Sequence, residues 1–253
     1  MASEDGSTAA DDFARLLAVF ERTGRQGPGS EATTRRALRS LPAGLQVRRV
    51  LDLGCGTGGS TIVLARETSA HVIAVDSHAP FLRILSDHAA RSGLSDRITT
   101  VVMDMAKAED LGKDFDLIWA EGSAYSIGFT NALALWLPLL RPGGCLVVTE
   151  LVWFAAEPSA RARDFFAAVY PAMRDEASCV AVAQAAGFAV VDSFRLPPDD
   201  WRTYYAGVDE AVRQAVAEAG DCPLYAALRT ERDMYVEFGD EYGYLCLILG
   251  SSG

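Results

Sequence analysis

The chain has 253 residues, enough for one large domain with a full core, and half of them are hydrophobic, which predicts a globular protein. Acidic residues outnumber basic ones by 34 to 23, giving a net charge of −11 at pH 7. Such a surface repels phosphate backbones, so we expect no nucleic-acid partner. Since no apolar stretch approaches the ~20 residues of a membrane span, we expect no membrane partner either.

The first residues, M-A-S-E-D-G-S-T-A-A-D-D, are acidic and lack the basic and apolar regions of a signal peptide. The five cysteines are odd in number, scattered and without a C-x-x-C pair. This usage is typical of a reducing compartment and of a protein without structural zinc. We therefore expect a cytoplasmic protein with no metal site. The sequence leaves the oligomeric state open, a homodimer included.

The apolar periodicity of the chain predicts an α/β fold. Two amphipathic helices are expected first, one over residues 11–21 and one that follows Ser30, its N-cap, and runs to Leu41. From Val47 onward, short apolar runs alternate with amphipathic segments. The expected strands are 47–53, 71–75, 98–103, 115–120 and 144–150, and the expected helices between them are 59–67, 80–92 and 128–140. This alternation predicts a parallel sheet covered by helices on both faces.

The C-terminal part continues this pattern and then interrupts it. The expected elements are helices near 160–170 and 179–186, a sixth strand over 188–196 and a seventh over 242–249. About 45 residues separate the last two strands, and this connection is rich in aromatic residues and helical near 209–219 and 225–238. Long connections in compact domains are usually functional or disordered. The helical, aromatic composition favours a functional element.

Residues 50–59 read V-L-D-L-G-C-G-T-G-G, a short apolar strand followed by a glycine-rich turn and a helix. Gly54 and Gly56 allow backbone angles that a side chain would forbid and leave room for a ligand against bare peptide. Gly58 opens the helix, whose free N–H groups suit an anionic group. The string also satisfies G-x-G-x-x-G, so alone it would equally indicate a dinucleotide site. Asp52, two residues before the first glycine, extends it to D-x-G-x-G-x-G.

Further acids follow the next two strands. Asp76 lies about 20 residues after the turn, where a carboxylate can accept both ribose hydroxyls of an adenosine-containing ligand. Its alternative role is to cap the next helix, which Ser77 could do instead. Asp104, after the third strand, can accept from an adenine amino group while Met105 packs on the ring.

Together with the R-P-G-G string that leads into the fifth strand, this set resembles the class I S-adenosylmethionine (SAM) dependent methyltransferases over roughly residues 26–250. The strings G-P-G-S near residue 27, W-A-E-G-S-A-Y-S-I-G-F near 119 and the late Y-G-Y more narrowly resemble a bacterial subgroup that acts on small molecules. Members of this subgroup are related to the methyltransferases of quinone biosynthesis.

The resemblance implies a Rossmann-like, seven-stranded, mostly parallel sheet with an antiparallel last strand. It also implies a helical cap built from the N-terminus and from the insertion before that strand. We expect a single domain, whose parts are cap helices (1–45), a SAM-binding core (46–196), a cap insertion (197–240) and the last strand (241–253). SAM is then the cofactor and S-adenosylhomocysteine the product. The implied cofactor-binding residues are Asp52, Gly54, Cys55, Gly56, Gly58, Asp76, Ser77, Asp104, Met105 and Glu121.

Chemistry is expected where strands four and five end, because open parallel sheets bind ligands at the carboxyl ends of their strands. Glu121, Glu150 and Tyr125 are the candidate catalytic residues there, and we expect the two glutamates to project into one crevice. Aromatic residues of the insertion and of these strand ends could form a substrate wall, although core packing is the alternative for each. The candidate substrate-binding residues are Tyr125, Trp153, Trp201 and Tyr204.

The predicted activity is metal-independent methyl transfer to nitrogen or oxygen of a small-molecule metabolite. Methylation at carbon of a quinone-like or natural-product substrate is the nearest alternative. Two alternatives of other classes are an NAD(P)-dependent reductase and a non-catalytic SAM-binding protein. Asp104 and the antiparallel last strand favour SAM over a dinucleotide, because both belong to the methyltransferase pattern.

Overall fold

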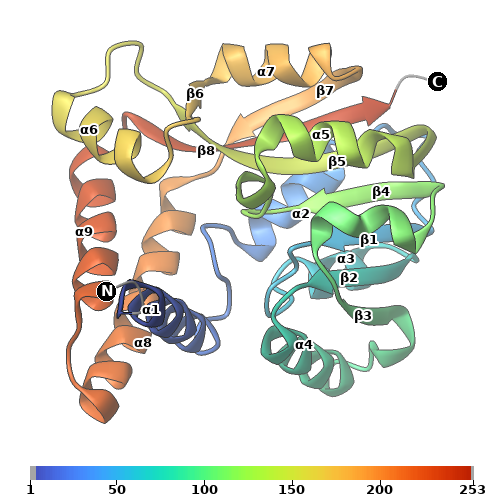
Figure 1. The fold of residues 1–253 in the computed structure, drawn as a ribbon. Coiled ribbons are helices and arrows are strands. Elements are labelled where there is room, and N and C mark those ends of the chain that lie inside the picture. The colour runs from blue at the N-terminus through green and yellow to red at the C-terminus, as the bar shows by residue number, and fades with distance from the viewer. Residues whose placement is uncertain (1–3, 252–253) are drawn as a thin grey trace.

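The computed structural model of the chain describes residues 4–251, which build one mixed sheet flanked by helices (Figure 1). The sheet has the strand order β3-β2-β1-β4-β5-β8-β7, and a short β6 pairs with the far end of β5. All neighbouring strands are parallel except β8, which runs antiparallel to both β5 and β7. The strands are β1 Arg49–Leu53, β2 His71–Asp76, β3 Ile98–Val102, β4 Phe115–Ala120, β5 Leu140–Trp153, β6 Arg174–Asp175, β7 Phe188–Arg195 and β8 Tyr242–Ser251.

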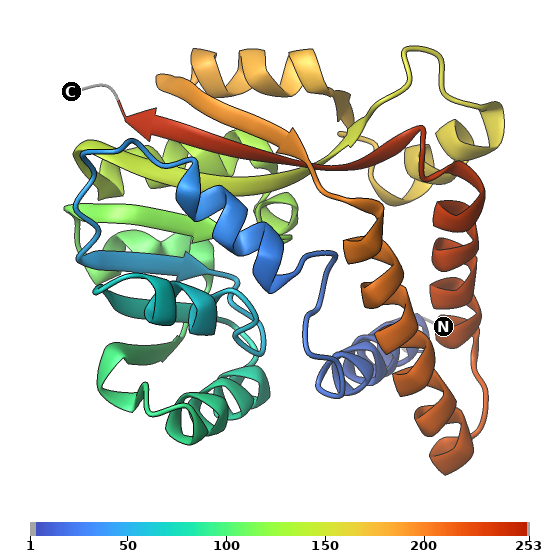
Figure 2. The same cartoon turned by 180° about the vertical axis from the view of Figure 1, so that it is seen from behind.

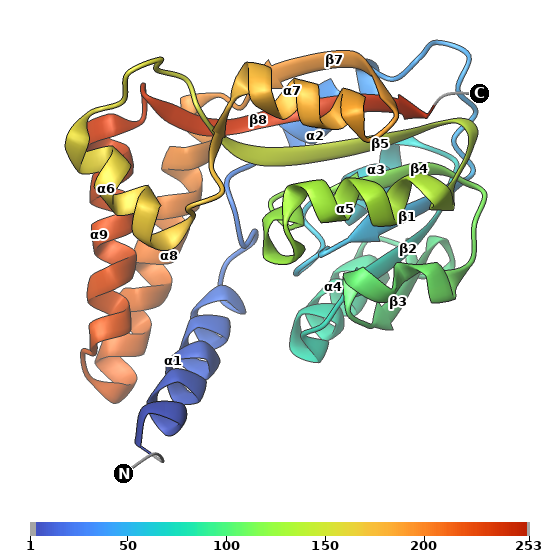
Figure 3. The ribbon, with the colours of Figure 1, turned by 45° about the horizontal axis from the view of Figure 1, so that its top comes forward.

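Helices lie on both faces of the sheet, and a separate group lies beyond one end of it. The helices are α1 Glu4–Phe20, α2 Glu31–Arg39, α3 Thr61–Glu67, α4 Ala79–Arg91, α5 Phe129–Trp136, α6 Ala160–Val169, α7 Glu176–Ala185, α8 Pro198–Ala219 and α9 Pro223–Phe238. Figures 1 and 3 show α1, α6, α8 and α9 gathered at the end of the sheet where β5 leads into α6. Figure 2 shows α2 on the face opposite to α5. None of the helices among residues 4–251 is both long and apolar enough to cross a membrane.

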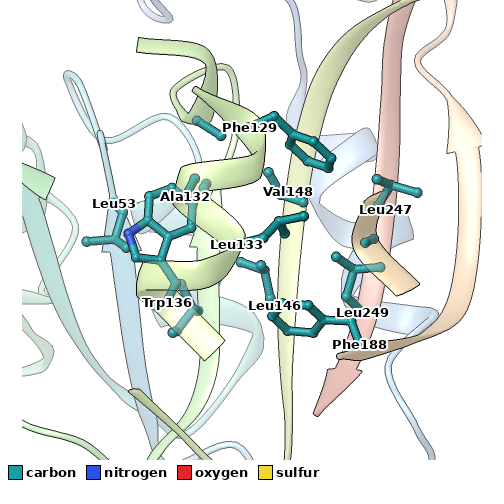
Figure 4. Close-up of a cluster of buried hydrophobic side chains, with 14 of the residues drawn as sticks. Leu53, Phe129, Ala132, Leu133, Trp136, Leu146, Val148, Phe188, Leu247 and Leu249 are labelled. Atoms are coloured by element: carbon teal, nitrogen blue, oxygen red, sulfur yellow. The ribbon is translucent and has the colours of Figure 1, made fainter. Parts of the chain in front are cut away.

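The core is divided by the sheet, because successive residues of a strand point to opposite faces. Leu146 and Val148 of β5 pack with α5 and α7 on one face, and Figure 4 shows α5 side chains such as Leu133 lying over them. Cys145 and Val147 pack with α2, α3 and α4 on the other face. Burial on both faces explains why these strands read as continuous apolar runs.

The helices beyond the sheet have a core of their own. Val19 of α1 packs against Val208 and Val212 of α8, and all three are almost fully buried. A second, aromatic cluster joins α6 and α8 to the sheet through Tyr242 of β8. The buried hydroxyl of Thr33 on α2 donates to Asp200 of α8 at 2.5 Å. These contacts fix α1 and α8 to the rest of the molecule.

The predicted α/β sheet with an antiparallel last strand is confirmed, and the structure adds the two-residue β6. Ser30 caps α2 as expected, since its hydroxyl accepts from the Thr33 amide. Several boundaries were wrong, and one of them is the start of α1, which lies at Glu4 rather than at residue 11. The helix predicted over 128–140 ends at Trp136, and β5 starts at Leu140, so R-P-G-G lies inside a strand whose register shifts against β4.

The largest difference concerns α8, which begins at Pro198 rather than near residue 209. Proline is well tolerated in the first turn of a helix because no intrahelical donor is lost there. Trp201, Tyr205, Val208 and Val212 then form a buried stripe at helical spacing. Trp201, Tyr204 and Tyr205 therefore belong to α8 itself.

We predict that Leu133→Ala will lower the free energy of unfolding by about 2–5 kcal/mol, because it removes a fully buried side chain and leaves a cavity beneath α5. Val236→Ala on α9, whose side chain is exposed, should change stability by less than about 0.5 kcal/mol and serves as the control. Urea denaturation measures both. Equal stabilities of the two variants would contradict the placement of Leu133 in the core.

Candidate functional site

The glycine-rich turn after β1 is shaped by glycines at positive φ. Gly54, Gly56 and Gly58 have φ values of 72°, 54° and 90°, a left-handed conformation that L side chains rarely adopt. Packing excludes side chains there as well. A Cβ on Gly54 would lie 2.4 Å from the Cβ of Ser123, and one on Gly58 would lie 2.2 Å from Leu85 Cδ1. The left-handed backbone of the turn agrees with the prediction, but side chains of the protein occupy the space beside these glycines that was expected to be open to a ligand.

Asp76, at the end of β2, lies directly beside this turn. Its Oδ2 accepts from the Gly56 amide at 2.9 Å and its Oδ1 from the His78 amide at 2.8 Å. Each carboxylate oxygen can accept a second hydrogen bond. Ser77 is exposed and does not cap α4, because the N-cap residue is His78 and no side-chain cap bond is formed.

Asp104 and Met105 lie at the next strand end. Asp104 is exposed and accepts from the Ala106 amide at 2.9 Å, so it caps the short 3₁₀ helix that follows. The Cε of Met105 reaches the turn, at 3.2 Å from the position that a Cβ on Gly54 would take. A ligand that rests on the turn would therefore meet the thioether of Met105.

Asp52 lies beneath the turn, 1% exposed. Its Oδ2 accepts from the hydroxyls of Thr61 at 2.6 Å and Ser60 at 3.3 Å. Burial raises the pKa of this carboxyl to about 7, although the Thr61 hydroxyl opposes the shift. Asp52 thus holds the start of α3 against β1, and Cys55 is buried beside it.

The loop between α1 and α2 covers the turn, which the sequence did not indicate. The Gln26 Oε1 accepts from the Thr57 amide at 2.9 Å and occupies the space above Gly56. Arg25 donates to the Gly59 carbonyl at 2.9 Å. The loop closes a cavity of about 60 Å³ together with the turn and the end of β4. Its lining residues are Arg25, Gln26, Gly27, Pro28, Gly54, Cys55, Gly59, Ser60, Glu121 and Gly122.

Glu121 closes this first cavity from the sheet side. Its Oε2 accepts from Arg25 at 2.5 Å, and its Oε1 accepts from the Thr34 hydroxyl and from Trp119 Nε1, both at 2.9 Å. Its side chain is only 10% exposed. Both carboxylate oxygens are therefore engaged in holding the loop and α2 to β4.

The expectation that Glu121 and Glu150 share one crevice is wrong. Glu121 lies on the sheet face of Trp119, toward α2, whereas Glu150 lies on the face of Val148, toward α7. Successive side chains of a strand point alternately to the two faces of the sheet. Residues at the ends of two adjacent strands can therefore point to opposite faces. The two carboxylates therefore face different surroundings.

Glu150 forms a buried pair with Tyr170. The Tyr170 hydroxyl donates to Glu150 Oε1 in a short hydrogen bond, and Glu150 Oε2 has no hydrogen-bond partner among the described residues. Burial raises the pKa of Glu150 to about 7 against the opposing effect of that bond. Burial, and next the Glu150 charge, raise the pKa of Tyr170. The sequence offered no signal for Tyr170, which lies 20 residues further along the chain.

A second cavity of about 600 Å³ lies between the sheet and the helices beyond its end. Its walls are mainly aromatic and aliphatic. They comprise Leu16, Phe20, Gln26, Gly27, Pro28, Tyr125, Leu151, Phe165, Phe166, Val169, Tyr170, Trp201, Tyr204, Tyr205, Leu224, Ala227, Leu228, Thr230, Glu231, Tyr242 and Tyr244. Gln26, Gly27 and Pro28 line both cavities, so the covering loop separates them.

Three of the four predicted substrate residues line this second cavity: Tyr125, Trp201 and Tyr204. Trp153 does not line it. It packs edge-on against Phe166 and Tyr242, with ring centroids 5.4 and 6.2 Å apart, and so supports the wall from behind. No group of three or more histidine, cysteine or acidic side chains in the described part of the chain is arranged to hold a metal ion.

Residues 50–144 match the family model described as a methyltransferase domain. This part of the chain is thus similar to methyltransferase domains. Methyltransferase GfsG of Streptomyces halstedii is 31% identical over 105 residues, 41% of this chain and 38% of the relative. Phosphoethanolamine N-methyltransferase 3 of Arabidopsis thaliana is 28% identical over 119 residues, 47% of this chain and 23% of the relative. The chain thus spans less than half the length of these curated relatives.

Solved structures extend the similarity beyond the domain to nearly the whole chain. A SAM-dependent methyltransferase from Geobacter sulfurreducens, solved with S-adenosylhomocysteine, has a TM-score of 0.74 at 22% identity and covers 93% of this chain and 97% of its own. The [4+2]-cyclase SpnF has a TM-score of 0.72 at 21% identity, and the match covers 97% of this chain and 94% of the cyclase. The resemblance to class I SAM-dependent methyltransferases is confirmed, and the narrower quinone-related subgroup stays a prediction. The cyclase illustrates that this fold alone does not fix the reaction.

We predict that Glu150→Gln will weaken the dependence of stability on pH. Because the folded-state pKa of Glu150 is raised from 4.5 to about 7, its contribution to stability is full below about pH 4.5 and is lost as the pH rises through about 7. Between about pH 4.5 and pH 8, the free energy of unfolding of the variant should fall by up to about 3 kcal/mol less than that of the wild type. Asp52, whose pKa is also raised, makes the stability of both proteins depend on pH in the same way, so its contribution cancels in the difference between them.

Urea denaturation at a series of pH values measures this difference. Glu157→Gln, a change at an exposed glutamate, should follow the wild-type curve. Parallel curves for Glu150→Gln and the wild type would mean that Glu150 is not desolvated in the folded protein.

Proposed function

We propose that the protein is a SAM-dependent methyltransferase that acts on a small molecule held in the second cavity. The observation that carries this proposal is the common wall of the two cavities, formed by Gln26, Gly27 and Pro28. Tyr244 lines the second cavity, and its hydroxyl lies 3.7 Å from the Cβ position of Gly122, which lines the first. The two cavities therefore adjoin, and a donor in the first and an acceptor in the second would come closest to each other beside Gly122 and Tyr244.

The donor site suits SAM in its residue types. Asp76 keeps one acceptor position on each oxygen for the ribose hydroxyls, and Asp104 and Met105 lie where an adenine ring would follow. The methionine end would enter the first cavity, against the backbone of Glu121 and Gly122. Related folds from Geobacter sulfurreducens and Thiobacillus denitrificans bind S-adenosylhomocysteine. When bound, SAM supplies a sulfonium methyl group that is already activated for transfer.

The chain itself then contributes position, exclusion of water and a proton acceptor. Residues 197–240, which contain α8 and α9, act as a cap together with α1, because all three helices line the second cavity. An acceptor in that cavity lies against aromatic walls that exclude water.

We assign the proton acceptor to the pair Tyr170 and Glu150 and the methylated atom to nitrogen or oxygen. An acceptor O–H or N–H would give its proton to the Tyr170 oxygen as Tyr170 passes its own to Glu150. The raised pKa of Glu150, about 7, suits a group that takes up a proton near neutrality. Tyr125 packs edge-on against Tyr170, with ring centroids 6.2 Å apart, and positions it. In this assignment Glu121 closes the donor site and takes no proton.

We predict that Asp76→Ala will weaken binding of S-adenosylhomocysteine at least tenfold, because each charge-assisted bond to the ribose contributes about 1.5–3 kcal/mol. Isothermal titration calorimetry measures the affinity. Asp87→Ala changes an exposed aspartate of α4, the helix that follows Asp76, and should bind S-adenosylhomocysteine as the wild type does. If Asp76→Ala binds S-adenosylhomocysteine with unchanged affinity, Asp76 does not contact the ribose. Failure of the wild type to bind SAM or its product would refute the proposed function itself.

We predict that Tyr170→Phe and Glu150→Gln will each lower kcat by roughly 10²–10⁴ with little change in KM, once an acceptor has been found by screening metabolites for S-adenosylhomocysteine release. Tyr235→Phe is the matched control, since this tyrosine stacks on Trp201 outside the cavity wall. Near-normal turnover of both variants would leave positioning and desolvation as the source of catalysis.

A further inference from the structure

Glu231 is a charged residue in a cavity that is otherwise neutral. It lies on α9, and among the described residues that line the second cavity it alone has an ionisable acidic or basic side chain other than tyrosine. The other walls are aromatic, aliphatic or small and polar. A carboxylate in such surroundings is costly unless a partner compensates its charge.

Tyrosines from three elements surround this carboxylate. The Tyr205 hydroxyl of α8 donates to Glu231 Oε1 at 3.3 Å. After burial, the charge of Glu231 is the next cause that raises the pKa of Tyr125 and of Tyr204. It also contributes to the raised pKa of Tyr244, on β8. Glu231 therefore faces aromatic rings that line the same cavity.

No cationic side chain within residues 4–251 forms an ion pair with Glu231. The two arginines nearest to it in α9 are engaged elsewhere: Arg229 pairs with Asp221 at 2.8 Å, and Arg232 pairs with Asp209 at 2.8 Å. Burial, with no cation to oppose it, raises the pKa of Glu231. The described residues thus supply no cation to compensate the charge of this carboxylate.

We propose that the second cavity binds a small molecule that carries a positively charged nitrogen, which pairs with Glu231 among the tyrosine rings. An anionic partner combined with aromatic rings is the arrangement that stabilises a desolvated ammonium through charge pairing and cation–π contact. The apolar remainder of the cavity takes a hydrophobic body. The ammonium is the anchor of the ligand, whichever of its atoms accepts the methyl group. Its identification as the methyl acceptor rests on the proposed function.

A matched series of probes tests the charge preference directly. Phenethylamine, phenethyl alcohol and phenylacetate are similar in size and carry a cationic, a neutral and an anionic end. Calorimetry with the full chain should give a dissociation constant for the amine at least tenfold below that for the alcohol, and no measurable binding of phenylacetate. Equal affinity for amine and alcohol would overturn the proposal, because a protonated Glu231 would then act as a neutral hydrogen-bond partner.

Glu231→Gln keeps the size and the hydrogen-bonding capacity of the side chain but removes its charge, so the preference for the amine should disappear. Glu231→Asp keeps the charge and should retain part of the preference for the amine. This variant also tests the proposal if Glu231→Gln folds poorly. Glu237→Gln, on the same helix but exposed and paired with Arg161, should bind as the wild type does. A preference that survives in a folded Glu231→Gln would place the cation site elsewhere.

Affinity for S-adenosylhomocysteine is measured on the same samples. If the wild type binds S-adenosylhomocysteine but does not prefer the amine, the cation site alone is contradicted. Amine preference without such binding would retain the cation site and contradict the methyltransferase function.

Discussion

The ion pair between Arg25 and Glu121 is the interaction on which the arrangement of the site depends. It joins the loop after α1 to the end of β4 at 2.5 Å, in surroundings that leave the two side chains 18% and 10% exposed. Removing one partner of a buried pair leaves an uncompensated charge, which commonly costs 3–5 kcal/mol. Thr34 and Trp119 add two hydrogen bonds to the same carboxylate. The covering loop is therefore fixed over the glycine turn, and the wall that separates the two cavities is fixed with it.

The alternation of side chains along the central strands gives two neighbouring carboxylates different roles. Glu121 follows β4 on the face that carries α2, where an arginine and two other donors meet it. Glu150 lies in β5 on the face that carries α7, where one tyrosine meets it and one oxygen has no partner among the described residues. The first carboxylate accepts hydrogen bonds on both oxygens in a closed network, whereas burial raises the pKa of the second. A sheet buried on both faces makes such a division possible within a few residues.

Features that depend on local sequence could be predicted, and features that depend on distant contacts could not. The glycine turn, the Ser30 cap and the order of strands and helices follow from turn chemistry, capping and apolar periodicity, which act over a few residues. The start of α8 was predicted wrongly, although Trp201, Tyr205 and Val208 repeat at helical spacing and so gave a local signal for it. The contact of Arg25 with Glu121 spans 96 residues, and no local pattern indicates it. Which face of the sheet receives Glu150 follows from the register of β5, and the strand proved longer than its apolar run.

Polar groups without partners among the described residues occur in and beside the second cavity. Glu150 Oε2 and the Tyr242 hydroxyl are buried without hydrogen-bond partners among the described residues, and Glu231 lacks a cationic partner there. Folded proteins satisfy nearly all of their buried polar groups, so exceptions that cluster at one place call for a physical reason. A ligand that supplies the missing partners would relieve their desolvation when it binds. Because the cap helices α8 and α9 carry part of this wall, the same ligand would also strengthen the attachment of the cap to the sheet. Ligand binding and attachment of the cap to the sheet would then be coupled, because the same side chains take part in both.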